Sequence, residues 1–388
     1  MRIAVPPRRR ASYSGVLTGA SPRVGPRGRH SRLWWLRGAA FAAALLLATL
    51  ALLRAPPRLG GRDDEQAAYA PLPRTCAALR DSLAPAAATP EARPWHARSA
   101  LYAAIATDFG RQGFGGVSGA GGTQGMSVSA LFDWDAATDM PHPRLRRLPV
   151  PVRAVVLPLP PASPAVAAMA AAARDALLEL CGAPGVWLQD PDAYHLSLFH
   201  ASHHLQPVPA DAAQLRGEAD AVAAVMNASC PVSVVLERVV VTRGGVFIAC
   251  WNVLRGAEPE ALRAALRAAL PRAPEAQLVS DAPILHSTLA RVLRPPRDDA
   301  AASAAALGAA ATALSKRLCG LRARLDAAWF VAEHDALALA LRGKYEATEL
   351  QLQCGTPETD ASRREAEPFR PETRGVALGG RALDSHGR

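Results

Sequence analysis

The chain has 388 residues, half of them hydrophobic, so it can form a sizeable core in two ordinary domains or in one large domain with appendages. Its net charge of +10 comes from the first 62 residues, which contain twelve arginines and no lysine or acidic residue. From Asp63 onward, 32 basic residues stand against 34 acidic ones. This near-neutral part argues against a long nucleic-acid groove, which needs many phosphate contacts, but it is compatible with a small or terminal phosphodiester.

The first 54 residues predict a tail and a membrane anchor. Residues 1–32 are rich in Arg, Pro, Gly and Ser and are expected to be a disordered basic tail. The uncharged apolar run 38–53 makes a helix of about 24 Å, and the preceding Leu33 to Leu36 extend it toward the roughly 30 Å of a bilayer core. Arginine is denser before the run than after it. We therefore expect residues 33–54 to be a type II signal anchor, with the part of the chain that follows it lumenal in the endomembrane system.

Two other interpretations of this segment stay open. An Arg-rich, acid-poor N-terminus is also typical of a transit peptide for a plastid or mitochondrion, and a cleaved signal peptide with a long basic region fits as well. A Pro/Ala-rich stalk is expected over residues 55–93, with a short helix around 76–83. A domain over 94–355 and a disordered tail over 356–388 follow.

Within the domain, the hydrophobic spacing predicts helices and short strands in alternation. Helices are expected over 95–109, 164–180, 212–228, 259–270 and 300–319. Besides two motif strands, strands are expected over 152–159, 232–237, 239–251, 323–333 and 346–354. The β-branched runs on either side of Arg243-Gly244-Gly245 predict an antiparallel hairpin or meander. The glycine-rich stretch 110–125 has no strand before it and no helix with a Lys-Ser/Thr pair after it, so we interpret it as a flexible loop.

The stretch Tyr194-His195-Leu196-Ser197-Leu198-Phe199 alternates with period two, as a β-strand with one face in a cleft does. His195 and Ser197 then point to one side, while Tyr194, Leu196 and Leu198 point into apolar packing. A second copy, Ile284-Leu285-His286-Ser287-Thr288-Leu289, places His286 and Thr288 on one face in the same way. The repetition of an imidazole followed two residues later by a hydroxyl makes a functional role the better interpretation.

Two imidazoles that face each other can act as a general base and a general acid near neutral pH, and a hydroxyl beside each can donate to a phosphate oxygen. This set suits transfer or hydrolysis at a phosphodiester, and it needs no metal. We expect His195 and His286 to be catalytic and Ser197 and Thr288 to bind phosphate. Which histidine is the acid depends on the orientation of the substrate and stays open.

The paired motifs resemble the signature of the 2H phosphoesterase superfamily. The sequence around them is most similar to the plant and green-algal RNA ligase/cyclic nucleotide phosphodiesterase family proteins. The stretches that carry this resemblance are His195 to His204 and Ala282 to Arg291, and we extend it from about 94 to about 355. The resemblance implies an α+β, bilobal fold in which two pseudo-symmetric lobes of antiparallel sheet and helices face a central cleft and supply one motif each. It also implies a cyclic phosphodiesterase with a small nucleotide or RNA-end substrate. We expect no cofactor and a monomer.

Several other residues have competing interpretations. His200, His203 and His204 follow the first motif, but no cysteine or carboxylate stands at ligand spacing, so a solvated or rim cluster is favoured over a zinc site. Six scattered cysteines allow fifteen disulfide connectivities behind a signal anchor, and Asn227-Ala228-Ser229 is a glycosylation sequon that supports a lumenal location only weakly. The aromatic residues that could stack on a base are expected to be core residues instead; they are Phe199, Trp251 and Trp329.

Two functional alternatives remain beside the phosphoesterase. The same fold could be a nucleotide- or phosphate-binding module, or an enzyme acting on a non-RNA phosphodiester, and a lumenal location would itself weaken an RNA substrate. A membrane-tethered scaffold with merely packed motif residues is disfavoured because both motifs are complete and in the expected order.

Overall fold

A computed structural model of the chain describes residues 74–84, 92–115 and 124–354. The expected basic tail (1–32), membrane anchor (33–54) and C-terminal tail (356–388) lie outside these residues. Of the helices in the described ranges, none combines the length and apolar character that crossing a membrane requires.

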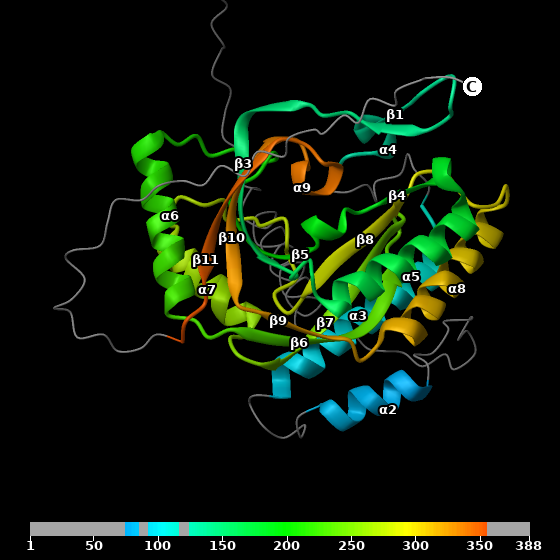
Figure 1. Ribbon diagram of the computed structural model, residues 1–388, viewed down its shortest axis with the longest axis horizontal. Helices are drawn as coiled ribbons and strands as arrows, with labels where there is room; N and C mark the ends of the chain where they lie inside the picture. Colours follow the sequence, from blue (N-terminus) through cyan, green and yellow to red (C-terminus); the bar gives the residue numbers. More distant parts are fainter. Residues whose placement is uncertain (1–73, 85–91, 116–123, 355–388) are drawn as a thin grey trace, which may run out of the picture. The chain divides into compact units, whose positions relative to one another are not determined.

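The described residues form a mixed structure of helices and antiparallel strands (Figure 1). The α-helices are α2 (Arg74–Leu83), α3 (Ala92–Gln112), α4 (Val128–Leu131), α5 (Pro164–Cys181), α6 (Ala212–Asn227), α7 (Pro259–Ala269), α8 (Ala300–Leu318) and α9 (Ala338–Leu341). Two short 3-10 helices are η1 (Ala183–Gly185) and η2 (Pro191–Ala193). The strands are β1 (Phe132–Trp134), β2 (Pro141–Pro143), β3 (Arg147–Pro158), β4 (Val186–Leu188), β5 (His195–Ser202), β6 (Val232–Val241), β7 (Val246–Arg255), β8 (His286–Val292), β9 (Arg322–Leu325), β10 (Ala327–Asp335) and β11 (Tyr345–Gln351).

Two sheets organise the described region, and each contains one motif strand. The four-stranded sheet has the order β11-β10-β3-β5, and the five-stranded sheet has the order β4-β8-β7-β6-β9. All pairings in both sheets are antiparallel. The first motif strand, β5, is an edge strand. The second, β8, pairs with β4 only over its last three residues, so its motif end is also open on that side.

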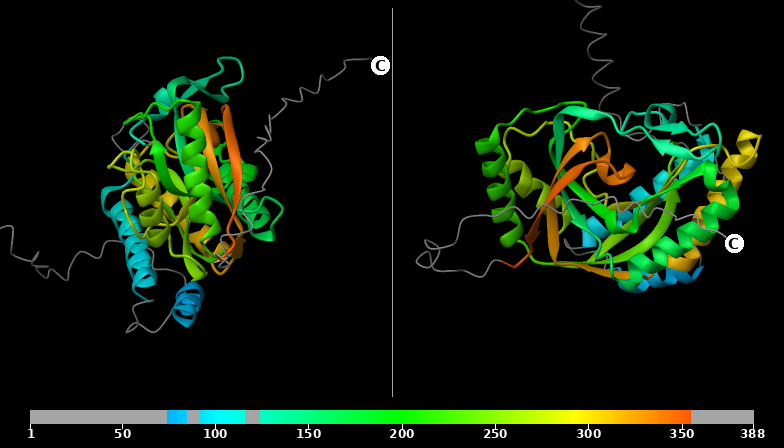
Figure 2. Two further views of the ribbon diagram at one scale, coloured as in Figure 1. Left: turned by 90° about the vertical axis from the view of Figure 1, so that its left-hand side faces the viewer. Right: turned by 45° about the horizontal axis from the view of Figure 1, so that its top comes forward.

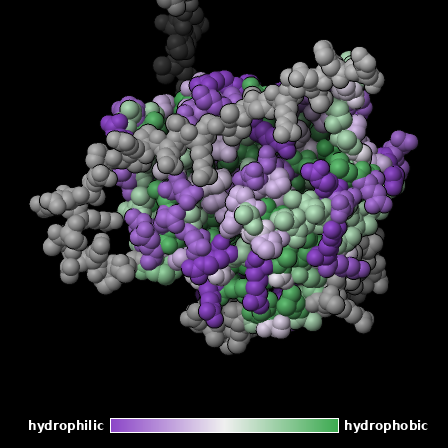
Figure 3. Space-filling view, viewed as in Figure 1, coloured by the Kyte–Doolittle hydropathy of each residue, from purple (hydrophilic) through white to green (hydrophobic). Residues whose placement is uncertain are grey.

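Helices cover the side of each sheet that faces the main hydrophobic core, and α3 packs on the opposite side of the five-stranded sheet, where Tyr102 contacts Ile248 and Cys250. Helices α6 and α7 lie next to each other and contact strands of the four-stranded sheet, whereas α5 and α8 lie next to each other against the five-stranded sheet (Figures 1 and 2). The core contains side chains from both sheets, including Leu196, Phe199 and the fully buried Trp251. Figure 3 shows hydrophobic side chains among hydrophilic ones on the right-hand and lower parts of one face.

The sequence predicts the long helices well but two strands incorrectly. All five expected helices of the domain and the short helix near Cys76 are present, with ends shifted by up to three residues. The strand expected over 239–251 is divided, because residues 239–241 end β6 and residues 246–251 begin β7. The expected strand over 323–333 is instead two strands: β9 pairs with β6 and β10 pairs with β3, so the chain passes from one sheet to the other at Asp326. A continuous β-like run does not reveal such a change of partner.

The predicted hairpin is formed by β6 and β7. Gly245 closes it with a φ of 74°, a backbone conformation that favours glycine. A β-carbon at this position would also come too close to Phe114 and Val292.

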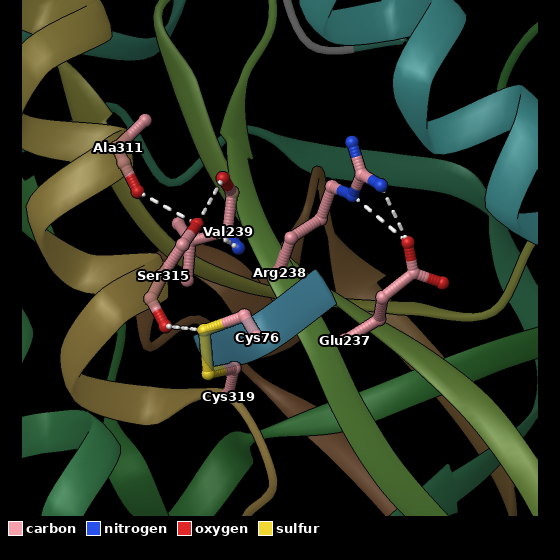
Figure 4. Close-up of a disulfide and its surroundings, with 7 residues drawn as sticks. All are labelled: Cys76, Glu237, Arg238, Val239, Ala311, Ser315 and Cys319. Atoms are coloured by element: carbon pink, nitrogen blue, oxygen red, sulfur yellow. Dashed lines mark hydrogen bonds and ion pairs between the residues drawn. A yellow bond between two sulfur atoms is a disulfide. The ribbon is translucent and has the colours of Figure 1, made fainter. Parts of the chain in front are cut away.

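Two disulfides secure the described region, whereas the sequence left the connectivity open. Cys76–Cys319 joins α2 to the residue after α8, and Cys230–Cys354 joins the residues that flank β6 and β11; Cys181 and Cys250 are free thiols. In Figure 4 the first disulfide lies beside Ser315.

The side chain of Ser315 closes an open part of a strand edge (Figure 4). Strand β9 pairs only with residues 232–235 of β6. Farther along β6, the Ser315 hydroxyl accepts the Val239 N–H at 2.8 Å and lies 3.0 Å from the Val239 carbonyl, so it takes the place of a neighbouring strand. The disulfide and Ser315 thus attach α2, α8 and β6 to one another.

Candidate active site

The side chains of the two motif strands alternate as the sequence predicts. On β5, Leu196 and Leu198 are buried while His195 and Ser197 are partly exposed. The second strand, β8, repeats this order, with a buried Ser287 and Leu289 between and after the partly exposed His286 and Thr288. The hydrophobic core accounts for the buried positions, and the His-x-Ser/Thr pairs occupy the opposite face.

A β-bulge in each motif strand adds a third side chain to this face. Ser197 lies opposite Val156 and Phe199 opposite Val155, so Leu198 is an extra residue on β5. One extra residue shifts the alternation by one position, and His200 therefore lies on the same face as His195 and Ser197.

Strand β8 has its bulge at the corresponding position. Thr288 lies opposite Ile248 and Ala290 opposite Phe247, so Leu289 is the extra residue. Arg291 consequently lies on the face of His286 and Thr288. Each strand thus presents an imidazole, a hydroxyl and a third polar side chain, His200 on β5 and Arg291 on β8.

The two motif strands contact each other although they belong to different sheets. The charge of His195 acts on His286, and the Arg291 guanidinium acts on His195. The structure therefore brings all four residues predicted from the motifs into one region, together with Arg291.

His195 is held in one tautomer by the backbone. Its Nδ1 lies 2.8 Å from the Ala193 carbonyl, which accepts the Nδ1–H and leaves Nε2 with a free lone pair. Burial lowers the pKa of His195, the carbonyl acts in the opposite direction, and the Arg291 charge lowers the pKa further. Part of the ring remains accessible to solvent, but most of its surroundings are protein. The free Nε2 is the atom that can take up or deliver a proton.

His286 is fixed through its neighbours in the chain. The Tyr102 phenol oxygen accepts the Leu285 N–H at 3.1 Å and lies 2.8 Å from the Leu285 carbonyl. On the other side of His286, the indole N–H of Trp251 donates to the Ser287 hydroxyl at 3.1 Å. Burial, followed by the charges of His195 and Arg263, lowers the pKa of His286 to about 4. In the free protein at neutral pH this imidazole is therefore uncharged.

Arg291 supplies positive charge to the same face. It is buried, and burial lowers its pKa to about 10, which still leaves the guanidinium protonated at neutral pH. A phosphate placed between the hydroxyls of Ser197 and Thr288 would meet neutral donors and this cation.

The histidines that follow the first motif are not the solvated rim cluster that the sequence favoured. His200 and His203 are only 4% and 2% exposed. The Nε2 of His203 lies 2.9 Å from the Ala276 carbonyl oxygen, and its Nδ1 accepts a hydrogen bond from the Gln206 N–H. Both ring nitrogens therefore have hydrogen-bond partners. His204 faces the Gln124 carbonyl. Within residues 74–84, 92–115 and 124–354, no three His, Cys, Asp or Glu side chains are grouped to hold a metal ion.

The candidate stacking residues divide into two groups. Phe199 and Trp251 are buried in the core, as the sequence predicts. Trp329 is partly exposed and lies opposite Val156, on the same side of its sheet as Ser197, where it packs against a smaller hydrophobic cluster.

Sequence reasoning missed Arg291, Tyr102 and Arg263 as parts of the site. Arg291 follows His286 by five residues, as His200 follows His195. In a regular strand this odd spacing would place Arg291 and His200 on the face opposite the motif histidines, and only the bulges bring them to the same face. Tyr102 and Arg263 act through backbone contacts that join distant parts of the chain, and no local pattern indicates them.

No family model and no curated protein matches the chain. Solved structures do show similarity. TT0787 of Thermus thermophilus is 18% identical, with a TM-score of 0.33, 52% of this chain and 98% of that chain covered. The conserved protein ATU0111 of Agrobacterium tumefaciens is 13% identical, with a TM-score of 0.36 and coverage of 53% and 86%. Usb1 of Kluyveromyces marxianus, solved with uridine monophosphate, is 13% identical, with a TM-score of 0.32 and coverage of 52% and 97%.

Proposed function

We propose that this protein is a metal-independent phosphoesterase that hydrolyses a cyclic or 3′-terminal nucleotide phosphodiester. His195 and His286 are its acid/base pair, and Ser197 and Thr288 bind the phosphate. We also infer that the two sheets correspond to the two lobes of a 2H phosphoesterase-like fold, because each contributes one His-x-Ser/Thr motif.

One observation carries this proposal: the two motif strands, far apart in the sequence and in different sheets, meet with their imidazoles and hydroxyls on partly exposed faces. Packing alone does not require this arrangement, since the alternate residues of both strands already fill the core. Arg291 on the same face adds the charge that phosphate recognition uses.

The chemistry follows from the protonation states. Both motif imidazoles have lowered pKa values in the free protein, and an anionic phosphodiester between them favours the protonated form of one. The neutral imidazole takes a proton from the attacking water, or from a ribose hydroxyl, and the protonated one gives its proton to the leaving oxygen. The hydroxyls and Arg291 stabilise the charge that develops on the phosphate oxygens.

The test is an assay of the protein with EDTA against 2′,3′-cyclic nucleotides, ADP-ribose cyclic phosphate and short RNAs with defined 3′ ends. Turnover of at least one of these substrates that survives the chelator is expected. Loss of activity in EDTA and its return with zinc would contradict the proposal. Binding without turnover on any of these compounds would instead favour a nucleotide- or phosphate-binding module.

We further propose that the catalytic part lies in an oxidising, membrane-bound compartment, with residues 33–54 as its anchor and a monomer as its working form. The two disulfides support this location, because such bonds persist in the secretory pathway and are rare in the cytosol. Protease protection of a C-terminal tag in sealed microsomes, together with resistance to alkaline extraction, is the expected result. A processed N-terminus inside a plastid would contradict it.

A further inference from the structure

Arg263 of α7 connects the backbone of β5 to the backbone of the residues just before β8. Its Nε donates to the Leu198 carbonyl at 3.0 Å and its Nη2 to the Ser197 carbonyl at 3.2 Å, both on β5. The same Nη2 donates to the Ile284 carbonyl at 2.8 Å, and Nη1 donates to the Ala282 carbonyl. One planar guanidinium therefore holds carbonyls on both sides of the site.

These contacts lie next to the proposed catalytic groups. The Ser197 carbonyl belongs to a residue whose hydroxyl is expected to bind phosphate, and Ile284 lies two residues before His286. Strand β5 is an edge strand and has no strand partner on this side in its sheet. Since β5 and β8 belong to different sheets, no strand ladder fixes their separation, and the guanidinium supplies a direct link.

We propose that Arg263 is a positioning residue that fixes the spacing of the two motif strands, and with it the geometry in which His195 and His286 face one substrate. This inference rests on the proposed function. A guanidinium suits the task because its five N–H donors lie in one plane and can serve several carbonyls at once, whereas a lysine ammonium cannot reproduce this fork.

The link also has an electrostatic consequence for His286. All the hydrogen-bond acceptors of Arg263 given above are neutral carbonyls, and its charge lowers the pKa of His286. The other groups near His286 are His195 on β5, the buried Cys250 thiol opposite it on β7 and the Tyr102 phenol. Burial raises the pKa of both Cys250 and Tyr102, so neither is charged at neutral pH.

Three titratable groups act on Arg263: the charged Arg98 and Glu260, and Tyr102, which is neutral at pH 7. Burial lowers the pKa of Arg263 to about 10, and it remains a cation at neutral pH.

Arg267 offers a matched control. It lies one turn farther along α7 and also donates to backbone carbonyls, those of Ala273, Pro274 and Glu275. Its guanidinium also covers the Phe199 ring at 4.7 Å. It contacts neither the β5 carbonyls nor those of Ala282 and Ile284 beside His286, so its loss removes a similar number of hydrogen bonds without breaking the link between the motifs.

The experiment compares R263M, R263K and R267M in the full chain by steady-state kinetics and by NMR titration of the His286 ring. R263M is expected to lower kcat by roughly 10- to 100-fold with little change in KM, because misplacing the acid and base affects the reacting geometry more than binding. R263K should recover part of this loss. The His286 pKa should rise in R263M and stay unchanged in R263K and R267M, since only R263M removes the charge beside it.

An unchanged kcat and an unchanged His286 titration in a folded R263M would overturn the proposal, and so would an equal loss of kcat in R267M. If R263M does not fold, R263K decides, because a lower kcat with an unchanged His286 titration is expected there and an unchanged kcat contradicts the proposal. The titration needs no substrate. A rise of the His286 pKa in R263M would therefore support the link even if the protein turned over none of the tested phosphodiesters.

Discussion

His200 and Arg291 occupy corresponding positions on the two motif strands. Each follows the histidine of its motif by five residues, and a bulge at Leu198 or Leu289 turns each toward the face of that histidine. The two side chains nevertheless differ in charge. Burial, with the nearby histidines, lowers the pKa of His200 to about 3, whereas Arg291 remains a cation at neutral pH.

This difference predicts unequal roles in phosphate binding. Arg291→Met is expected to lower kcat/KM by roughly 10²- to 10³-fold, because it removes a preorganised cation from the phosphate oxygens. Arg291→Lys should retain part of the activity. His200→Asn, which removes an uncharged ring from the corresponding position, should cost less than roughly tenfold. Kinetics on variants whose circular dichroism matches wild type would test this, and equal losses for Arg291→Met and His200→Asn would contradict it.

The buried histidines predict acid sensitivity of the fold. His200 and His286 have pKa values of about 3 and about 4, below their ordinary value of 6.5, so the unfolded chain binds more protons than the folded one in this window. The free energy of unfolding should therefore be highest above pH 6.5 and fall as the pH drops toward 4 and below. Urea unfolding between pH 4 and pH 7 measures this slope.

The substitution His286→Asn should make that slope shallower because it removes one of the titrating groups. Replacing the exposed His96 by Asn controls for the loss of one histidine. A slope equal to wild type in His286→Asn would mean that this ring is not protonated more easily in the unfolded chain.

For the carboxyl of Glu333, the free energy of unfolding is predicted to depend on pH in the opposite direction. It is buried, its Oε1 accepts the Leu339 N–H at 2.7 Å, and burial raises its pKa to about 7. The folded state therefore binds this proton more tightly than the unfolded chain, and the carboxyl lowers stability as the pH rises from 4.5 to 7. Glu333→Gln keeps an oxygen that can accept from Leu339. It should raise the melting temperature at pH 8 and leave it nearly unchanged at pH 5, and the reverse order would refute the assignment.

The sequence predicts the faces of the motif strands but not their partners. Period-two alternation places His195 and Ser197 against Leu196 and Leu198, because burial of every second side chain is a local property of a strand. The bulge at Leu198 shifts the alternation without any residue that marks it.

The long-range contacts could not be predicted from the sequence either. The meeting of β5 with β8, the change of sheet at Asp326 and the bonds of Arg263 all join segments that are distant in the chain. The burial of His200 and His203 could not be predicted for the same reason. Polar residues after a motif are expected to face solvent unless their distant backbone partners are known.

The two disulfides predict how many cysteines can be alkylated before and after reduction. Alkylation of the denatured, non-reduced protein should label two cysteines, Cys181 and Cys250, and reduction should expose four more. Cys319→Ala should lower stability by roughly 2 to 4 kcal/mol, because the bond to Cys76 constrains a long loop of the unfolded chain. Peptide mapping by mass spectrometry identifies the pairs. Six free thiols in protein isolated under alkylating conditions would contradict both the pairing and the oxidising compartment.

The most direct test of the central claim is the rate of phosphodiester hydrolysis in EDTA by wild type, His195→Ala, His286→Ala and the double variant. Acid and base act as one unit, so each single substitution should lower kcat by on the order of 10²-fold or more, and the double variant should lose little beyond the worse single one. The wild-type pH profile should be bell-shaped, because the two imidazoles must hold opposite protonation states. Full activity in either single variant, or multiplicative losses in the double variant, would contradict a paired-histidine mechanism.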